Sequence, residues 1–202
     1  MPPTEMMPQV IVVEVRRKRR WPWVLGIFAL LSIICCGICA AVTGPIWKEY
    51  PSRIAVMPDQ VGGLRRDDNG IVRLVALAAA DRIRQEQGVD NGFADAFVDP
   101  NANDRNAYVF GGTLLVWDPA GTMRQAIQDA GTSISDVTSL DAGSMGGELK
   151  CANGKDDKRK AIVICAWVDH GSVGIGVFYG GRSMLDSAAF LRALRAAIII
   201  RP

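Results

Sequence analysis

The feature that most constrains this chain is an apolar run over residues 21–47 that contains no charged side chain. As an α-helix rising 1.5 Å per residue, the part from Trp23 to Val42 would by itself span about 30 Å, which is the hydrocarbon thickness of a bilayer. Tryptophans at both ends of the run are typical of the headgroup region. The run therefore predicts a transmembrane helix over residues 21–47.

The charges beside this run predict its orientation. The sequence RRKRR at residues 16–20 precedes it directly, whereas the residues after it are far less positive. By the positive-inside rule we expect a single-pass protein of the cell membrane, with residues 1–20 as a cytoplasmic basic tail and the C-terminal part extracytoplasmic. A tail this short cannot bury a core, which excludes a cytoplasmic kinase or DNA-binding domain there.

The alternative to a retained anchor is a cleavable signal peptide. Small residues at Cys39, Ala40 and Ala41 offer a possible cleavage point. The apolar run is nevertheless much longer than the usual h-region of about 7–15 residues, and a long leader precedes it. These two features favour a retained anchor.

The rest of the chain has the composition of a folded domain. The whole sequence is 49% apolar and 22% charged, which is enough apolar content for a packed core. Once the basic tail is set aside the charges nearly balance, which disfavours nucleic-acid binding. Residues 48–64 contain prolines and a Gly-Gly pair without periodicity, so we expect a juxtamembrane linker there and one domain over residues 65–202.

Periodicity and turn residues predict an α+β fold for this domain. Strands follow one another with hairpin-length connections, so the sheet should be mainly antiparallel, with about three helices covering one side. The predicted strands cover residues 93–98, 106–117, 135–140, 147–151, 161–169 and 174–179. The first predicted helix has an apolar stripe over residues 72–83 and stops at Gly88. The other two cover residues 119–130, after an Asp118 N-cap, and a last segment that begins after Ser183.

The last helix has a capping-box-like start, with Asp186 three residues after Ser183. Its spacing predicts an apolar face and a polar face. The apolar face is expected to carry Phe190, Leu191, Leu194 and Ile198, and the polar face Asp186, Arg192 and Arg195.

Two cysteines, Cys151 and Cys165, lie outside the apolar run. They flank a polar loop between two predicted strands and would be level across a hairpin, so on an oxidising face of the membrane we expect a disulfide between them. The alternative is a metal or redox pair, which the absence of a nearby histidine and of a C-x-x-C spacing disfavours.

One histidine occurs in the chain, His170, between Asp169 and Ser172. A hydrolase triad would need the three side chains to converge on a pocket, but neighbouring residues of an extended chain point to opposite faces. Asp-His-Gly-Ser is also an ordinary turn composition. We expect a turn, with catalysis as the alternative.

The segment from Asp99 to Asp104 begins like a calcium-binding loop. Asp104, however, stands where the loop needs glycine, and Phe110 where it needs a bidentate glutamate, so we expect a solvated hairpin loop and no metal. Three Gly-Gly pairs lack the lysine and spacing of a phosphate-binding loop, and we expect no cofactor.

A family resemblance is carried by two segments, together with the basic tail and the single span. The segments are GGELKC, at residues 146–151, and VICAWVDHGSVGIGVF, at residues 163–178. The chain resembles uncharacterised single-pass membrane proteins of actinobacteria. The resemblance implies a cell-surface location and carries over no catalytic residues.

Two functions are compatible with these observations. The first is a non-enzymatic extracytoplasmic domain, tethered to the lipid bilayer, that binds another envelope protein or acts as an accessory module. The alternative is an envelope hydrolase that uses Asp169, His170 and Ser172. A pocket that joins these three groups would favour the hydrolase.

Overall fold

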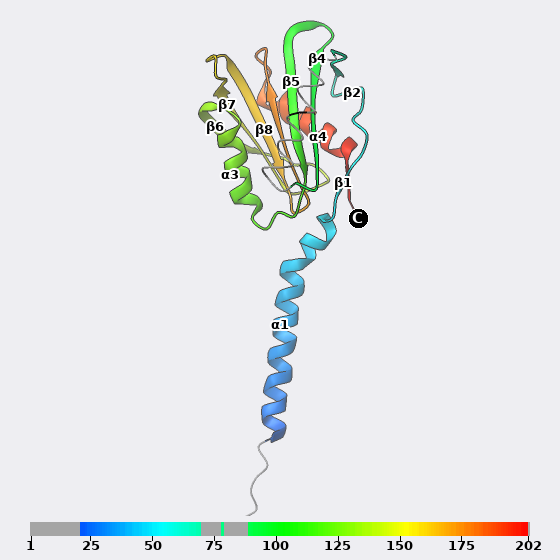
Figure 1. Ribbon diagram of the computed structural model, residues 1–202. Helices are drawn as coiled ribbons and strands as arrows, with labels where there is room; N and C mark the ends of the chain where they lie inside the picture. Colours follow the sequence, from blue (N-terminus) through cyan, green and yellow to red (C-terminus); the bar gives the residue numbers. More distant parts are fainter. Residues whose placement is uncertain (1–20, 70–77, 79–88, 202) are drawn as a thin grey trace, which may run out of the picture. The chain divides into compact units, whose positions relative to one another are not determined.

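The structure is a computed structural model that describes residues 21–69, 78 and 89–201 (Figure 1). The chain divides into two compact units, residues 1–41 and residues 42–202. The expected helix over residues 72–83 falls almost wholly outside the described residues.

Helix α1 (Trp21–Glu49) contains the apolar run. From Leu25 to Glu49 it is long and apolar enough to cross a membrane, and none of its most apolar part is buried. A signal sequence near an N-terminus can have the same length and apolar character. The helix extends two residues beyond the expected end at Trp47, and its last turns belong to the second unit.

The second unit is built on an eight-stranded antiparallel sheet, which confirms the α+β class (Figure 1). In order across the sheet, the strands are β2 (Gln60–Val61), β3 (Leu64–Arg66), β4 (Asn91–Asp99), β5 (Ala102–Thr113), β9 (Ser172–Phe178), β8 (Ala161–Val168), β7 (Glu148–Lys155) and β6 (Thr132–Leu140). A separate pair joins β1 (Arg53–Ile54) to β10 (Ile199–Ile200). The chain expected to be a linker thus contributes β1 and β2.

Two described helices pack on this sheet, and they lie on opposite faces. Helix α3 (Pro119–Asp129) packs on β6, β7 and β8, and helix α4 (Met184–Ile198) packs on β7, β8 and β9. Alternate residues of β8 belong to two separate buried clusters, with Cys165 and Trp167 on the α4 side and Ile164 and Ala166 on the α3 side. The expectation that the helices cover one side is therefore wrong, because β8 is apolar at every position and buried on both faces.

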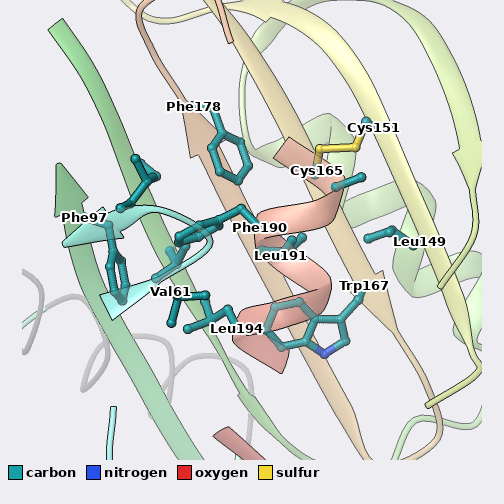
Figure 2. Close-up of a cluster of buried hydrophobic side chains, with 14 of the residues drawn as sticks. Val61, Phe97, Leu149, Cys151, Cys165, Trp167, Phe178, Phe190, Leu191 and Leu194 are labelled. Carbon is teal, nitrogen blue, oxygen red and sulfur yellow. A yellow bond between two sulfur atoms is a disulfide. The ribbon is translucent and has the colours of Figure 1, made fainter. Parts of the chain in front are cut away.

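The larger cluster lies between the sheet and α4 (Figure 2). Phe190 of α4 meets Phe97 and Phe178 edge-to-face, with ring centroids 5.3 and 5.6 Å apart, and Trp167 stacks on Phe93 at 5.9 Å. Edge-to-face and stacked pairs are favourable geometries for buried aromatic rings. This cluster is the main core of the domain.

Strand β5 differs from its predicted bounds, residues 106–117, at both ends. It begins at Ala102, which pairs with Asp99, so the hairpin turn is shorter than expected. It ends at Thr113, opposite Ser172, the first residue of β9. The backbone N–H groups of Leu114 and Val116 instead donate to the turn at Gly171 and His170.

The predicted helix starts are confirmed. The Asp118 carboxylate accepts a hydrogen bond from the N–H of Gly121 at 3.0 Å, and Pro119 occupies the first turn of α3. The Ser183 hydroxyl oxygen accepts from the N–H of Asp186 at 3.1 Å and donates to the Asp186 carboxylate at 2.7 Å. Local side-chain chemistry therefore sets where both helices begin.

Candidate functional site

The predicted disulfide is present between Cys151 and Cys165. The two residues are directly opposite in the β7–β8 pairing, and both are fully buried on the α4 side of the sheet (Figure 2). The bond therefore links two neighbouring strands inside the main core, where no solvent reaches it.

The Asp169 carboxylate organises the turn between β8 and β9. Its Oδ1 atom accepts from the N–H of Gly171 at 2.8 Å, from the N–H of Ser172 at 2.5 Å and from the Ser172 hydroxyl at 3.0 Å. The Ser172 oxygen also accepts from the indole N–H of Trp167 at 3.2 Å, and Ser172 is fully buried. Asp169 and Ser172 are thus brought together, as the partners of an Asx turn.

The His170 ring is engaged elsewhere. Its Nδ1 atom lies 2.8 Å from the carbonyl oxygen of Val116, and because a carbonyl only accepts, Nδ1 carries the proton. The His170 backbone N–H donates to Glu49 at 2.7 Å. Within the described part of the chain, no hydrogen bond joins the His170 ring to Asp169 or Ser172. The three groups therefore do not form the relay that a hydrolase needs.

Two arginines hold the other oxygen of Asp169. Its Oδ2 atom accepts from Arg195 and, at 3.0 Å, from Arg201, which also reaches Glu49 at 3.5 Å. Arg195 in addition donates to the carbonyl oxygen of Gly146 at 2.7 Å. We call Glu49, Asp169, Arg195 and Arg201 the ionic cluster.

The expectation that Arg195 lies on the polar face of its helix is wrong. Its side chain is 2% exposed, and the Asp169 side chain is fully buried. Arg195 follows Leu191 by four positions, which places both on the buried stripe of α4. A buried guanidinium is tolerated there because Asp169 and the Gly146 carbonyl pair with it.

The electrostatics of the cluster keep Asp169 charged. Burial alone would raise the pKa of this carboxyl, but the charge of Arg195, the Gly171 N–H and the hydrogen bonds from both arginines outweigh it and lower the pKa below its usual value. Burial lowers the pKa of Arg195, against the opposing effect of Asp169. A carboxylate with both oxygens occupied by donors is suited to structure rather than to proton transfer.

The ionic cluster also fixes the end of α1 to the sheet. Glu49, the last residue of α1, bonds to His170 and Arg201. Gly171 packs so closely that a Cβ atom there would lie 1.8 Å from the carbonyl oxygen of Glu49. Only glycine fits this contact. We call this end of the second unit, where the β8–β9 turn meets Glu49, the anchor end.

A second candidate site is an apolar groove of about 160 Å³ between α3 and the sheet. Phe110 and Ile175 form part of its floor, and Ala126 of α3 forms part of its wall. Polar side chains, among them Gln125 and Asp129, line its rim. This volume is smaller than the roughly 300–1,000 Å³ of small-molecule pockets, so the groove is too small to enclose a drug-sized ligand.

The predicted hairpin loop after Asp99 uses its carboxylate locally. Asp99 accepts from the N–H of Asn101 at 2.9 Å and lies 4.0 Å from Arg105. Among the described residues, no group of three or more His, Cys, Asp or Glu side chains is placed to hold a metal ion. Gly180 and Gly181, which precede α4, have positive φ angles of 76° and 68° and serve a tight turn.

Comparisons with protein-family models, with curated proteins and with solved structures found no match.

Proposed function

We propose that this chain is a single-pass membrane protein that holds a binding or accessory domain of the cell envelope on the extracytoplasmic side. Residues 1–20 would stay in the cytoplasm, and the domain would bind another envelope protein. The charge asymmetry around α1, the length of its apolar run and the disulfide support this arrangement.

The observation that carries the binding role is the apolar groove beside α3. Phe110 and Ile175 remain half-buried there, although equivalent side chains on the other face are fully covered. The groove is small and lies beside an exposed helix, which fits the insertion of a partner's apolar side chain. The chemistry of the Asp169 turn offers no comparable support for hydrolysis.

Topology is tested with reporters fused after Pro202. We expect a reporter that folds only outside the cytoplasm to be active, and the full-length chain to stay in the membrane fraction. Activity of a strictly cytoplasmic reporter would overturn the orientation. Release of a shortened protein into the medium would show that the apolar run is a cleaved signal.

The binding role is tested by photo-crosslinking in living cells. A crosslinking amino acid at Gln125, on the exposed rim of the groove, should capture one discrete partner, and Phe110→Asp should abolish the capture. The matched control is the same crosslinker at Val137, which is 55% exposed on β6, away from the groove. Equal capture from both positions would contradict the groove as the binding site.

The enzyme alternative is tested by complementation of a deletion strain. We expect His170→Ala to retain function, since within the described chain the hydrogen bond of the His170 ring goes to the carbonyl oxygen of Val116. Phe110→Asp should lose function at normal abundance. Complete loss of function with His170→Ala, in a protein that folds normally, would favour the hydrolase instead.

A further inference from the structure

Trp117 is a large side chain that the fold leaves in solvent. It lies between the end of β5 and the start of α3 and is 72% exposed, although the residue before it, Val116, is buried. Covering the apolar surface of an exposed indole would lower the free energy by removing that surface from water. Its apolar ring with one N–H donor suits a boundary between water and an apolar phase.

Hydrogen bonds place Trp117 at the anchor end. The N–H of Val116 donates to the carbonyl oxygen of His170 at 3.0 Å, and Nδ1 of the His170 ring donates to the carbonyl oxygen of Val116 at 2.8 Å. The His170 N–H in turn donates to Glu49 at 2.7 Å. Two hydrogen-bonded steps therefore connect the residue beside Trp117 to the last residue of α1.

The backbone around Trp117 is fixed on both sides. Val116 is bonded to the β8–β9 turn, and Asp118 caps α3 through the N–H of Gly121 at 3.0 Å. The loop cannot fold Trp117 back into the core without breaking one of these contacts. The exposed position of the indole is thus built into the fold.

Little chain separates this end from the apolar run. Trp47, which is 74% exposed, precedes Glu49 by two residues, or about 3 Å along a helix. If α1 crosses the bilayer, Trp47 lies at the headgroup level and the anchor end follows within a few ångströms.

We propose that Trp117 inserts into the headgroup layer of the membrane that α1 crosses, so that the domain rests on the bilayer through Trp47 and Trp117. This inference rests on the proposed function, because it requires α1 to be a retained anchor. The partner is the lipid surface itself. Since Lys48 and Asp118 bring opposite charges to this end, the contact needs no anionic lipid and should form on phosphatidylcholine.

The test uses fluorescence of the full-length protein in phosphatidylcholine vesicles. The test variant carries Phe in place of Trp21, Trp23 and Trp47, so that Trp117 and Trp167 remain. A second variant carries Trp117→Phe in addition. Subtracting its spectrum, which comes from Trp167 alone, isolates the Trp117 signal. We expect this signal to be blue-shifted, to lose most of its intensity with lipids brominated near the top of the acyl chains, and to resist acrylamide.

The matched control is Lys158→Trp in the background that lacks Trp117. Lys158 is exposed in the β7–β8 loop, at the opposite end of β8 from the Asp169 turn, about 23 Å away at 3.3 Å per residue. Its indole should respond to acrylamide and not to brominated lipid.

The outcomes separate the two proposals. If carbonate washing releases the protein from the vesicles, the anchor proposal fails. If the protein stays inserted, two patterns would show that the membrane contact is wrong. In the first, Trp117 responds like the control. In the second, Trp117 is protected from acrylamide but is not quenched by brominated lipid. The second pattern would mean that another protein surface covers Trp117.

Discussion

The two faces of the sheet are covered very differently. On the α4 face, aromatic and aliphatic side chains form a continuous core around Phe190, Trp167 and the disulfide (Figure 2). On the α3 face the buried cluster is smaller, and Phe110 and Ile175 line an open groove. One face is therefore fully covered by its helix, and the other leaves apolar side chains half-buried at a groove.

The difference follows from the sequences of the two helices. Helix α4 is longer and places a phenylalanine and several aliphatic residues on the sheet, whereas α3 buries Met123, Ala126 and Ile127. Helix α3 also packs on β6, β7 and β8, so it leaves the adjacent strands β5 and β9 only half-covered. The position of the helix, rather than a lack of apolar residues, creates the groove.

The largest expected effect tests this contrast directly. Phe190→Ala should lower the free energy of unfolding by about 3–5 kcal/mol, because it removes a ring packed between Phe97 and Phe178 and leaves a cavity. Phe110→Ala, at the groove, should cost clearly less. Urea denaturation of the detergent-solubilised protein measures both. Equal costs would show that the two faces contribute alike.

Asp169→Asn should be nearly as costly, about 3–5 kcal/mol, because it leaves Arg195 buried without its counter-charge. The variant keeps an oxygen that can accept the turn hydrogen bonds, so the loss reports the ion pair. Asp156→Asn is the matched control, since Asp156 also accepts two backbone N–H bonds, from Lys158 and Lys160, but lies in the β7–β8 loop rather than in the ionic cluster.

The same variant predicts a change with pH. The pKa of Asp169 is lowered in the folded protein, so its stabilising contribution is present above the unfolded value of about 3.9 and is lost as the pH falls through the folded pKa. The wild type should therefore lose stability below about pH 4 more steeply than Asp169→Asn. Parallel acid curves for wild type and Asp169→Asn would contradict the prediction.

Removal of the disulfide should cost about 2–5 kcal/mol, the usual range for a small exported domain. We expect mass spectrometry of the unreduced protein to find Cys151 linked to Cys165, and the double variant Cys151→Ser, Cys165→Ser to unfold at lower urea. Two freely alkylated thiols in the folded domain would overturn the bond. Because both sulfurs lie on the α4 face, its loss should leave crosslinking at Gln125 intact.

Local signals in the sequence were sufficient for the features that depend on a few neighbouring residues. The helix caps at Asp118 and Ser183 and the pairing of Cys151 with Cys165 could be predicted because turn chemistry and hairpin spacing act over short separations. These features set the positions of the helices and the register of the β7–β8 hairpin.

The ionic cluster could not be predicted in the same way. Asp169 and Arg195 are 26 positions apart, and His170 and Glu49 are 121 positions apart, so no local pattern connects them. The sequence does hold two hints, the spacing of Arg195 from Leu191 and the uninterrupted apolar strand β8. Both indicate burial, and together they point to helices on both faces.

The smallest expected effect concerns the helix caps, where the two faces should behave alike. Ser183→Ala on α4 and Asp118→Ala on α3 each remove one acceptor of a backbone N–H, and each should cost about 1 kcal/mol. The corresponding glycine variants should lose only a few tenths, because glycine lets water reach the exposed N–H. Urea denaturation checks all four. A cost at Asp118 well above that at Ser183 would mean that the start of α3 carries more of the fold than its small buried cluster suggests. Since Asp118 follows Trp117, that result would also locate the excess stability at the anchor end rather than on either face of the sheet.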